Sequence, residues 1–211
     1  MRMRNKPNLL PRMEKCNSVL IREPEMYFGK WRSEIEGFSE LHLELGCGKG
    51  RFTIETAKMM PDVLIVAIER VPNAMVIAME RAINEKITNV RFVDGDAENL
   101  ADIFDKDEAG RIYINFCDPW PAKRHAKRRL TSKLFLEKYK NILGSGGEIH
   151  FKTDNSGLFE YSLEQFAENG FELSEVTRNL HEHGVTGNMT DYELKFFEQG
   201  IAIKRCVARV K

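Results

Sequence analysis

The sequence lacks long hydrophobic runs and paired cysteines, and these absences exclude several classes of protein. Its longest apolar stretch, Val63 to Ile68, is far shorter than the roughly 20 residues that a transmembrane helix needs. The N-terminal MRMRNKPN is basic but lacks the apolar core of a signal peptide. The four cysteines are widely spaced, without a Cys-x-x-Cys pair, which argues against a disulfide framework or a zinc site. We therefore expect a cytoplasmic protein with no membrane segment.

The chain also lacks net charge, with 32 basic and 32 acidic residues, but the charge is distributed unevenly. Residues 1–32 carry a balance of +5 and residues 121–140 a balance of +7, whereas residues 93–110 carry −6. A single charged run is usually a solvated surface. The electric field near a patch depends on local charge, however, so two basic segments leave a polyanionic partner open.

Short apolar runs alternate with helical patterns after an N-terminal arm. Residues 1–38 contain three prolines and little periodicity, so we expect an irregular, partly flexible basic arm and a single domain over 39–211. The alternation predicts an α/β fold with a mostly parallel seven-stranded sheet, helices on both faces and an antiparallel edge strand. The expected strands are 41–45, 63–69, 90–93, 111–117, 148–153, 171–177 and 201–210, and the expected helices are 50–60, 73–85, 98–104, 132–143 and 157–168.

The segment ELGCGKGR (44–51) joins the first strand of this domain to its first helix, and its glycines allow a tight turn close to a ligand. It departs from the dinucleotide pattern Gly-x-Gly-x-x-Gly at Arg51, and from a P-loop because Gly50 follows Lys49. Glu44 would repel a phosphate and would suit an ammonium or sulfonium group. The loop therefore argues against a phosphate ligand.

Two further acids end the next two strands. Glu69 could accept both hydroxyls of a ribose, and Asp96 could accept from an adenine amino group. Each acid alone could equally lead or cap the following helix. Together with the glycine loop, they describe a nucleoside site without phosphates, and S-adenosylmethionine is such a ligand.

Several segments resemble the tRNA (guanine-N7-)-methyltransferase family of the bacterial TrmB type. They are ELGCGKGRF (44–52), AIER (67–70), GDAENL (95–100), NFCDPWP (115–121), KRHAKRRL (123–130), HFKTDN (150–155) and TDYE (190–193). The resemblance implies a Rossmann-like class I methyltransferase fold, S-adenosylmethionine as methyl donor without a metal, and a guanine in the tRNA variable loop as acceptor. The donor-binding residues that it implies are Glu44, Gly46, Gly48, Glu69, Asp96, Ala97 and Asp118.

The loop NFCDPWP carries the expected catalytic residue, Asp118. N7 of guanine bears no proton, so methyl transfer needs alignment and electrostatics but no general base. Asp118 could accept from the N1 and N2 hydrogens of the base, and Trp120 could stack on a base. The competing interpretation is an Asp-Pro turn that ends a strand, with Trp120 filling the core.

The following basic row would hold the RNA backbone while Asp118 and Trp120 face the base. The sequence departs from the family at Ala122, where a lysine is usual, so the contact of that lysine is not expected here. The predicted RNA-binding residues in this row are Lys123, Arg124, His125, Lys127, Arg128 and Arg129.

The resemblance also assigns Asp154 and the TDYE segment, Thr190, Asp191, Tyr192 and Glu193, to the substrate. Asp154 could instead cap a helix, and TDYE is also a capping-box pattern. His181 and His183 have no nearby carboxylate or cysteine pattern, so we expect no metal there. We expect tRNA as partner, no membrane contact and no obligatory protein partner, in a monomer or homodimer.

Three alternatives remain open. An amino-methylating enzyme would have a related Asp-Pro-Pro-aromatic loop, but here only Pro119 lies between the acid and Trp120. An RNA-binding module with a vestigial donor pocket is disfavoured by the intact acids. A nicotinamide oxidoreductase is disfavoured by Arg51 and by the first loop.

Overall fold

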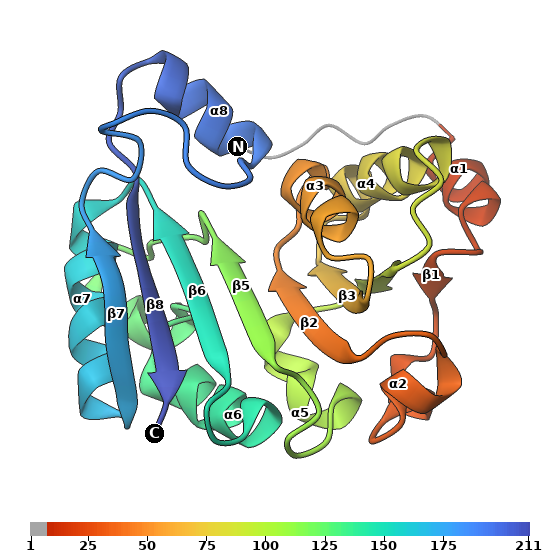
Figure 1. The fold of residues 1–211 in the computed structure, drawn as a ribbon, viewed down its shortest axis with the longest axis horizontal. Helices are drawn as coiled ribbons and strands as arrows, with labels where there is room; N and C mark the ends of the chain where they lie inside the picture. The colour runs from red at the N-terminus through yellow and green to blue at the C-terminus, as the bar shows by residue number, and fades with distance from the viewer. Residues whose placement is uncertain (1–7) are drawn as a thin grey trace. The chain divides into compact units, whose positions relative to one another are not determined.

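The computed structural model describes residues 8–211, which form two compact units, one ending at Phe104 and one spanning Asp105–Lys211 (Figure 1). Residues 1–7, the start of the expected basic arm, lie outside the described residues.

The first unit is built on four parallel strands in the order β1-β4-β3-β2. The register pairs Leu45 with Ile68 and Glu69 with Asp94, so β2, β3 and β4 end at the same level. The carboxyl ends of these strands therefore bring the loops that follow them to one edge. The strands are β1 (Leu20–Ile21), β2 (Glu40–Leu45), β3 (Val63–Glu69) and β4 (Val90–Asp94), and the helices are α1 (Leu9–Lys15), α2 (Trp31–Glu34), α3 (Arg51–Met59), α4 (Pro72–Asn84) and α5 (Leu100–Ile103), with short 3-10 helices at Pro24–Tyr27 and Ala97–Asn99.

Residues 8–38 do not form the irregular segment that the sequence predicts. They contain α1, α2, a 3-10 turn and the additional strand β1, which pairs with β4. Arg12 of α1 donates from Nε to Glu80 of α4 over 2.7 Å. The Trp31 side chain is fully buried, stacks on Phe104 and donates to the carbonyl of Ile103 over 3.0 Å. The described part of this segment therefore packs into the first unit.

The second unit has its four strands in the order β5-β6-β8-β7. β5 and β6 are parallel, whereas β8 is antiparallel to both β6 and β7, which confirms the expected antiparallel edge. Helix α8 was not expected. The strands are β5 (Arg111–Asn115), β6 (Glu148–Thr153), β7 (Phe171–Thr177) and β8 (Lys204–Val210), and the helices are a 3-10 helix (Lys123–Arg128), α6 (Lys133–Leu143), α7 (Ser156–Glu168) and α8 (Asp191–Glu198).

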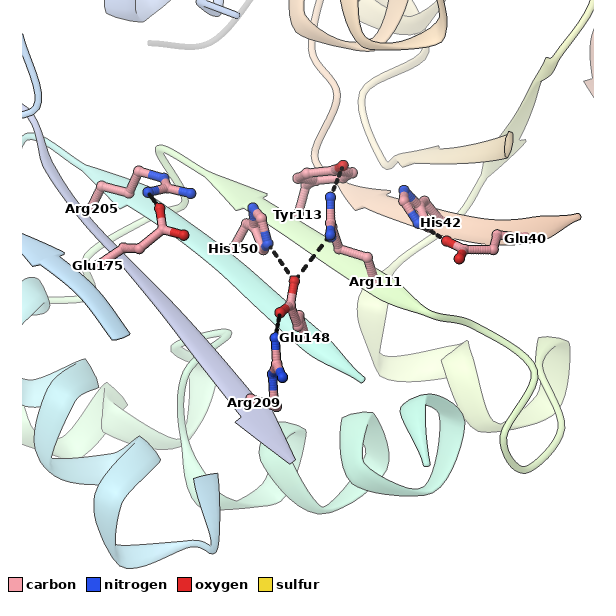
Figure 2. A network of polar contacts seen from close by, with 9 residues as sticks. All are labelled: Glu40, His42, Arg111, Tyr113, Glu148, His150, Glu175, Arg205 and Arg209. Carbon is pink, nitrogen blue, oxygen red and sulfur yellow. Dashed lines mark hydrogen bonds and ion pairs between the residues drawn. The ribbon is translucent and has the colours of Figure 1, made fainter. Parts of the chain in front are cut away.

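The strands of the second unit separate apolar from polar side chains. Phe151 of β6 packs on Phe159 and Phe166 of α7, with ring centroids 6.3 and 6.2 Å apart. Successive side chains of a strand point to opposite faces, so Glu148 and His150 lie on the other face of β6. Figure 2 shows Glu148 there, joined to His150 and to arginines of β5 and β8.

The predicted α/β architecture with mostly parallel strands and an antiparallel edge is confirmed, and most predicted bounds hold within about two residues. The exceptions are the arm, which adds the unexpected strand β1 to the first unit, and the last strand, which begins at Lys204. Among residues 8–211, no helix combines the length and hydrophobicity that crossing a bilayer requires.

Candidate functional site

The glycine loop after β2 has left-handed backbone at Gly46 (φ 80°), Gly48 (φ 58°) and Gly50 (φ 79°), a conformation that favours glycine. A Cβ atom added at Gly50 would lie 2.5 Å from Cβ of Ala78, so this glycine allows α3 and α4 to approach. A Cβ added at Gly46 or Gly48 would meet no described atom within 4 Å. The backbone at these two glycines is therefore open to a ligand.

Glu69 at the end of β3 is 7% exposed and holds this loop in place. Its Oε2 accepts from the Gly48 N–H over 2.8 Å, and its Oε1 accepts from the Val71 N–H over 2.9 Å. Burial raises the pKa of Glu69, and the two backbone hydrogen bonds oppose that shift. Since each carboxylate oxygen can accept a second hydrogen bond, Glu69 can fix the loop and still receive ligand hydroxyls.

Glu44, one residue before the end of β2, is 1% exposed. Its Oε2 accepts from the Thr53 hydroxyl over 2.5 Å, which ties β2 to the first turn of α3. The carboxylate therefore links the strand before the loop to the helix after it, and its predicted role toward the donor stays a prediction.

Asp96 caps the short 3-10 helix after β4, because its Oδ1 accepts from the Glu98 N–H over 3.1 Å. Its Oδ2 lies 3.6 Å from Nη1 of Arg70, at the exposed surface, while the following Ala97 is buried. The capping alternative is thus observed. The Oδ2 atom thus faces the partly exposed guanidinium of Arg70. The predicted contact of Asp96 with adenine stays a prediction.

The loop 116–120 after β5 is held in an unusual conformation. Phe116 (φ 55°) and Trp120 (φ 40°) both adopt left-handed backbone, which is uncommon for bulky residues and concentrates at functional sites. The Phe116 N–H donates to the carbonyl of Lys152 on β6 over 2.9 Å. Asp118 lies between the two strained positions and is exposed. The loop therefore presents a carboxylate at the surface of the second unit.

Trp120 is partly buried by its own basic neighbours. The guanidinium of Arg128 lies over its ring, 4.9 Å from the centroid, and the His125 ring meets it edge-on at 5.7 Å. The interpretation of Trp120 as core filler is not what the structure shows, because the packed residues are themselves surface groups.

The basic row does not present its charges uniformly. Residues 123–128 form a 3-10 helix on which Lys123, Arg124 and Lys127 are exposed. Arg129 donates from Nε and Nη2 to the Trp120 carbonyl over 3.3 and 3.0 Å, and its predicted contact with phosphate stays a prediction. These residues carry the same charge but differ in exposure and in hydrogen-bond partners.

The structure assigns the cap of α7 to Asn155, whose Oδ1 accepts from the Leu158 N–H over 2.8 Å, and not to Asp154. Thr190 does begin α8 with a capping box: its hydroxyl accepts from the Glu193 N–H over 2.9 Å, and the Thr190 N–H donates back to Glu193 over 3.2 Å. Asp191 and Tyr192 follow in the first turn, where Tyr192 is 61% exposed.

Sequence reasoning missed the polar network around Glu193, which is 0% exposed. Lys152 of β6 donates to its two carboxylate oxygens over 3.1 and 2.9 Å, and His181 lies 3.0 Å away through Nε2. The His181 Nδ1 accepts from the Thr186 N–H over 3.2 Å, so the two ring nitrogens have different partners. His181 thus has the carboxylate neighbour that the sequence did not indicate, and the substrate role of Glu193 stays a prediction beside this structural one.

The described residues 8–211 offer few candidates for a catalytic nucleophile or a metal ligand. Loss of hydration raises the pKa of the Cys117 thiol to about 12, and the neighbouring Asp118 carboxylate adds to the shift. A thiol with so high a pKa is a poor nucleophile. Among residues 8–211, no group of three or more His, Cys, Asp and Glu side chains is arranged to hold a metal ion.

The fold of this chain is similar to that of known methyltransferases. The structure of the 16S rRNA methyltransferase KamB superposes with a TM-score of 0.66 at 15% identity, covering 86% of this chain and 93% of that one. Precorrin-6y C5,15-methyltransferase from Geobacter metallireducens GS-15 gives a TM-score of 0.57 at 15% identity, covering 94% and 87%. A tryptophan-to-alanine mutant of the 16S rRNA (adenine(1408)-N(1))-methyltransferase from Catenulisporales acidiphilia, solved with cosubstrate SAM, gives 0.58 at 12% identity, covering 82% and 86%.

At these identities the likeness shows the fold alone, which is the Rossmann-like class I methyltransferase fold expected above. A family model described as "Putative methyltransferase" matches residues 39–206 and therefore most of the chain. The chain belongs to this family, the TrmB-type methyltransferases.

Proposed function

We propose that this protein transfers a methyl group from S-adenosylmethionine to N7 of a guanine in the variable loop of tRNA, forming 7-methylguanosine. The observation that carries the proposal is the exposed Asp118 in a strained loop, followed at once by the exposed cations of the 3-10 helix. The family match over residues 39–206 supports the same reaction class. A tRNA substrate would place the protein in the cytoplasm.

The donor site that we propose uses residues of the first unit. Gly46 and Gly48 leave the backbone open, and Glu69 retains accepting capacity for ribose hydroxyls while it holds the loop. The buried Glu44 adds negative charge at the end of β2, just before the loop, which favours a cationic ligand over a phosphate. When bound, S-adenosylmethionine would supply an electrophilic methyl group. Asp96 and Ala97 would contact the adenine.

The acceptor chemistry that we propose needs no proton transfer at N7. A bond forms between N7 and the methyl carbon, the bond from that carbon to sulfur breaks, and its electron pair stays on sulfur as a neutral thioether. The guanine gains the positive charge. Asp118 would accept from its N1 and N2 hydrogens and would stabilise this charge, so its role is orientation and electrostatics.

The exposed cations Lys123, Arg124 and Lys127 would bind the phosphates of the RNA, and contacts of this kind supply affinity and position. Asp154, Thr190, Asp191 and Tyr192 would also contact the substrate, as the resemblance to the family implies. Ala122 carries no charge, so we expect the substitution Ala122→Lys to tighten tRNA binding.

The direct test uses methyl-labelled S-adenosylmethionine with unmodified tRNA, followed by digestion to nucleosides and identification of the labelled product. Label in 7-methylguanosine supports the proposal. Label in an amino-methylated nucleoside would favour the second enzyme class. Because two of the similar structures are 16S rRNA methyltransferases, a parallel incubation with 16S rRNA is included, and label only there would contradict tRNA as the substrate.

A pair of variants tests the role of Asp118. Asp118→Ala should lose turnover while it retains most tRNA affinity and donor binding, because it removes the group that faces the base. Asp102→Ala, which removes an exposed carboxylate of α5, is the matched control and should keep full turnover. Equal turnover in the two variants would show that Asp118 has no part in the reaction.

A further inference from the structure

The loop 116–120 carries conformational strain at both ends, and each end is anchored differently. At the first end, the Phe116 N–H bonds to β6 and the Phe116 ring meets Phe196 of α8, with centroids 6.0 Å apart. At the second end, Trp120 has φ 40°. A residue in this region persists only when its surroundings enforce the conformation. Something must therefore hold the backbone at Trp120.

Arg129 is the side chain that holds it. Its Nε donates to the Pro119 carbonyl over 3.1 Å and to the Trp120 carbonyl over 3.3 Å, and its Nη2 donates to the Trp120 carbonyl over 3.0 Å. The guanidinium also lies over the ring of Tyr161 on α7, 4.2 Å from the centroid. Helix α7 thus supports the guanidinium, and the guanidinium fixes two consecutive carbonyls of the loop.

We propose that Arg129 is a positioning residue that fixes the Asp118–Trp120 turn, rather than a phosphate ligand. The inference rests on the proposed function for its effect on turnover, but not for its effect on the loop. A planar guanidinium can donate hydrogen bonds to two carbonyls and stack on an aromatic ring at once. A lysine keeps the positive charge but lacks this planar geometry. Charge and geometry can therefore be separated by substitution.

The contrast within the basic row makes the inference specific. Arg124 is exposed on the 3-10 helix, as a phosphate-binding residue should be, whereas Arg129 is only partly exposed. The binding constant for RNA falls with rising salt, and removal of one phosphate-binding cation makes the slope of log K against log salt less steep by about 0.7 to 0.9. A lower slope below means a less steep one. Removal of a positioning residue leaves that slope unchanged.

The loop can be observed directly, because the chain has only two tryptophans. Incorporation of 5-fluorotryptophan gives two fluorine resonances, and Trp120→Phe identifies the one from the loop. Trp31, fully buried in the first unit, serves as the internal reference. In Arg129→Lys the Trp120 resonance should shift or broaden while the Trp31 resonance stays in place.

The same variant should lower kcat by about 10- to 100-fold with little change in tRNA affinity, since small misplacements of a reacting group have effects of this size. Arg129→Gln should behave alike and keep the wild-type salt slope, whereas Arg124→Gln should lower the slope. Arg178→Lys is the matched control: Arg178 also makes a two-pronged contact, to Glu160, and lies 5.9 Å from the Phe159 ring, but it is exposed. It should leave turnover and both resonances unchanged.

Tyr161→Leu provides a second route if Arg129 variants fold poorly, because it removes the stacked ring and no charge. It should shift the Trp120 resonance and lower kcat, and its effects should not add to those of Arg129→Lys. An unmoved Trp120 resonance in both variants, with a lower salt slope in Arg129→Gln, would overturn the inference. If the resonance moves but the wild-type protein makes no 7-methylguanosine, the proposed function fails and the positioning of the loop by Arg129 stands.

Discussion

The polar face of the second unit predicts a pH-dependent stability centred on His150. Its Nε2 lies 2.9 Å from Oε2 of Glu148, and the same carboxylate accepts from Arg111 over 3.0 Å and from Arg209 over 2.6 Å (Figure 2). His150 also meets the Tyr113 ring edge-on at 5.4 Å. The imidazole is therefore a poorly hydrated group among arginines.

Burial lowers the pKa of His150 from 6.5 to about 4, and the charges of Arg111 and Arg205 add to the shift, while the hydrogen bond to Glu148 opposes it. The folded state therefore binds fewer protons than the unfolded chain, whose imidazole titrates near 6.5. The stabilisation is complete above pH 6.5 and is lost as the pH falls toward 4. Between pH 8 and pH 5 these two pKa values correspond to a loss of about 2 kcal/mol.

Glu148 stays ionised across this window. Burial alone would raise its pKa, but hydrogen bonds from His150 and Arg209 and the charge of Arg111 outweigh burial and lower the pKa to about 2. Its own contribution is present above pH 4.5 and is lost only as the pH falls further toward 2. Glu148 therefore does not contribute to the change in stability between pH 8 and 5, and the part of that change due to the His150 imidazole can be isolated by substitution.

The assay is urea unfolding of the wild type and of His150→Gln at pH 8 and pH 5. Glutamine can still donate to Glu148 but does not titrate, so the variant should lose about 2 kcal/mol less than the wild type over this range. His183→Gln removes an exposed imidazole from a loop and is the matched control. Its two unfolding free energies should differ as those of the wild type do. Parallel behaviour of wild type and His150→Gln would refute the reasoning.

Two further predictions concern buried contacts and are tested by the same unfolding measurement. Glu193→Gln should lower the free energy of unfolding by about 3–5 kcal/mol, because it leaves the Lys152 ammonium buried without its carboxylate; a loss below about 1 kcal/mol would contradict this. Gly50→Ala should cost about 1–3 kcal/mol beyond its backbone strain, because the new methyl group meets Ala78, whereas Gly46→Ala has the same strained φ but open space and should cost less. Equal costs at the two glycines would exclude the clash with α4.

The sequence predicts the strands and the longer helices of this fold because their periodicity is strong. The run VLIVAIE became β3, buried along its whole length, and the pattern from Asn73 to Glu85 became α4, which begins one residue earlier with Pro72 at its first position. Pro fits the first helical position, since its missing N–H has no partner there anyway. Elements of this length carry their own signal.

The N-terminal arm was not predictable in the same way. Its helices have seven and four residues and its strand two, lengths at which local preference is too weak to form structure alone. They exist because of contacts with residues far along the chain, such as Arg12 with Glu80 and Trp31 with Ile103. Such tertiary partners leave no periodic signal in the arm itself.

The contacts of the basic side chains in the candidate site were also not predictable from the local sequence. The row from Lys123 to Arg129 reads as one property, positive charge, and the sequence predicts phosphate binding for every basic member. Arg124 and Arg128 are both exposed, but the guanidinium of Arg128 lies over the Trp120 ring. Arg129 is only partly exposed and donates to the Trp120 carbonyl. The number of charges can be read from the sequence. The contacts that each charged side chain makes depend on the conformation of the turn, and the residue types in the turn do not predict its positive φ angles.

Three residues of the candidate site have structural contacts, which for Asp96 and Thr190 are the helix caps that sequence reasoning offered as alternatives to function, yet the two roles do not compete. Glu69 accepts two backbone N–H groups, Asp96 caps a 3-10 helix and Thr190 begins α8. Carboxylate and hydroxyl oxygens can each accept more than one hydrogen bond. A structural contact moreover fixes the side chain, so less entropy is lost when a ligand binds. An observed cap or loop contact at these positions is therefore compatible with ligand binding, and by fixing the side chain it lowers the entropic cost of binding.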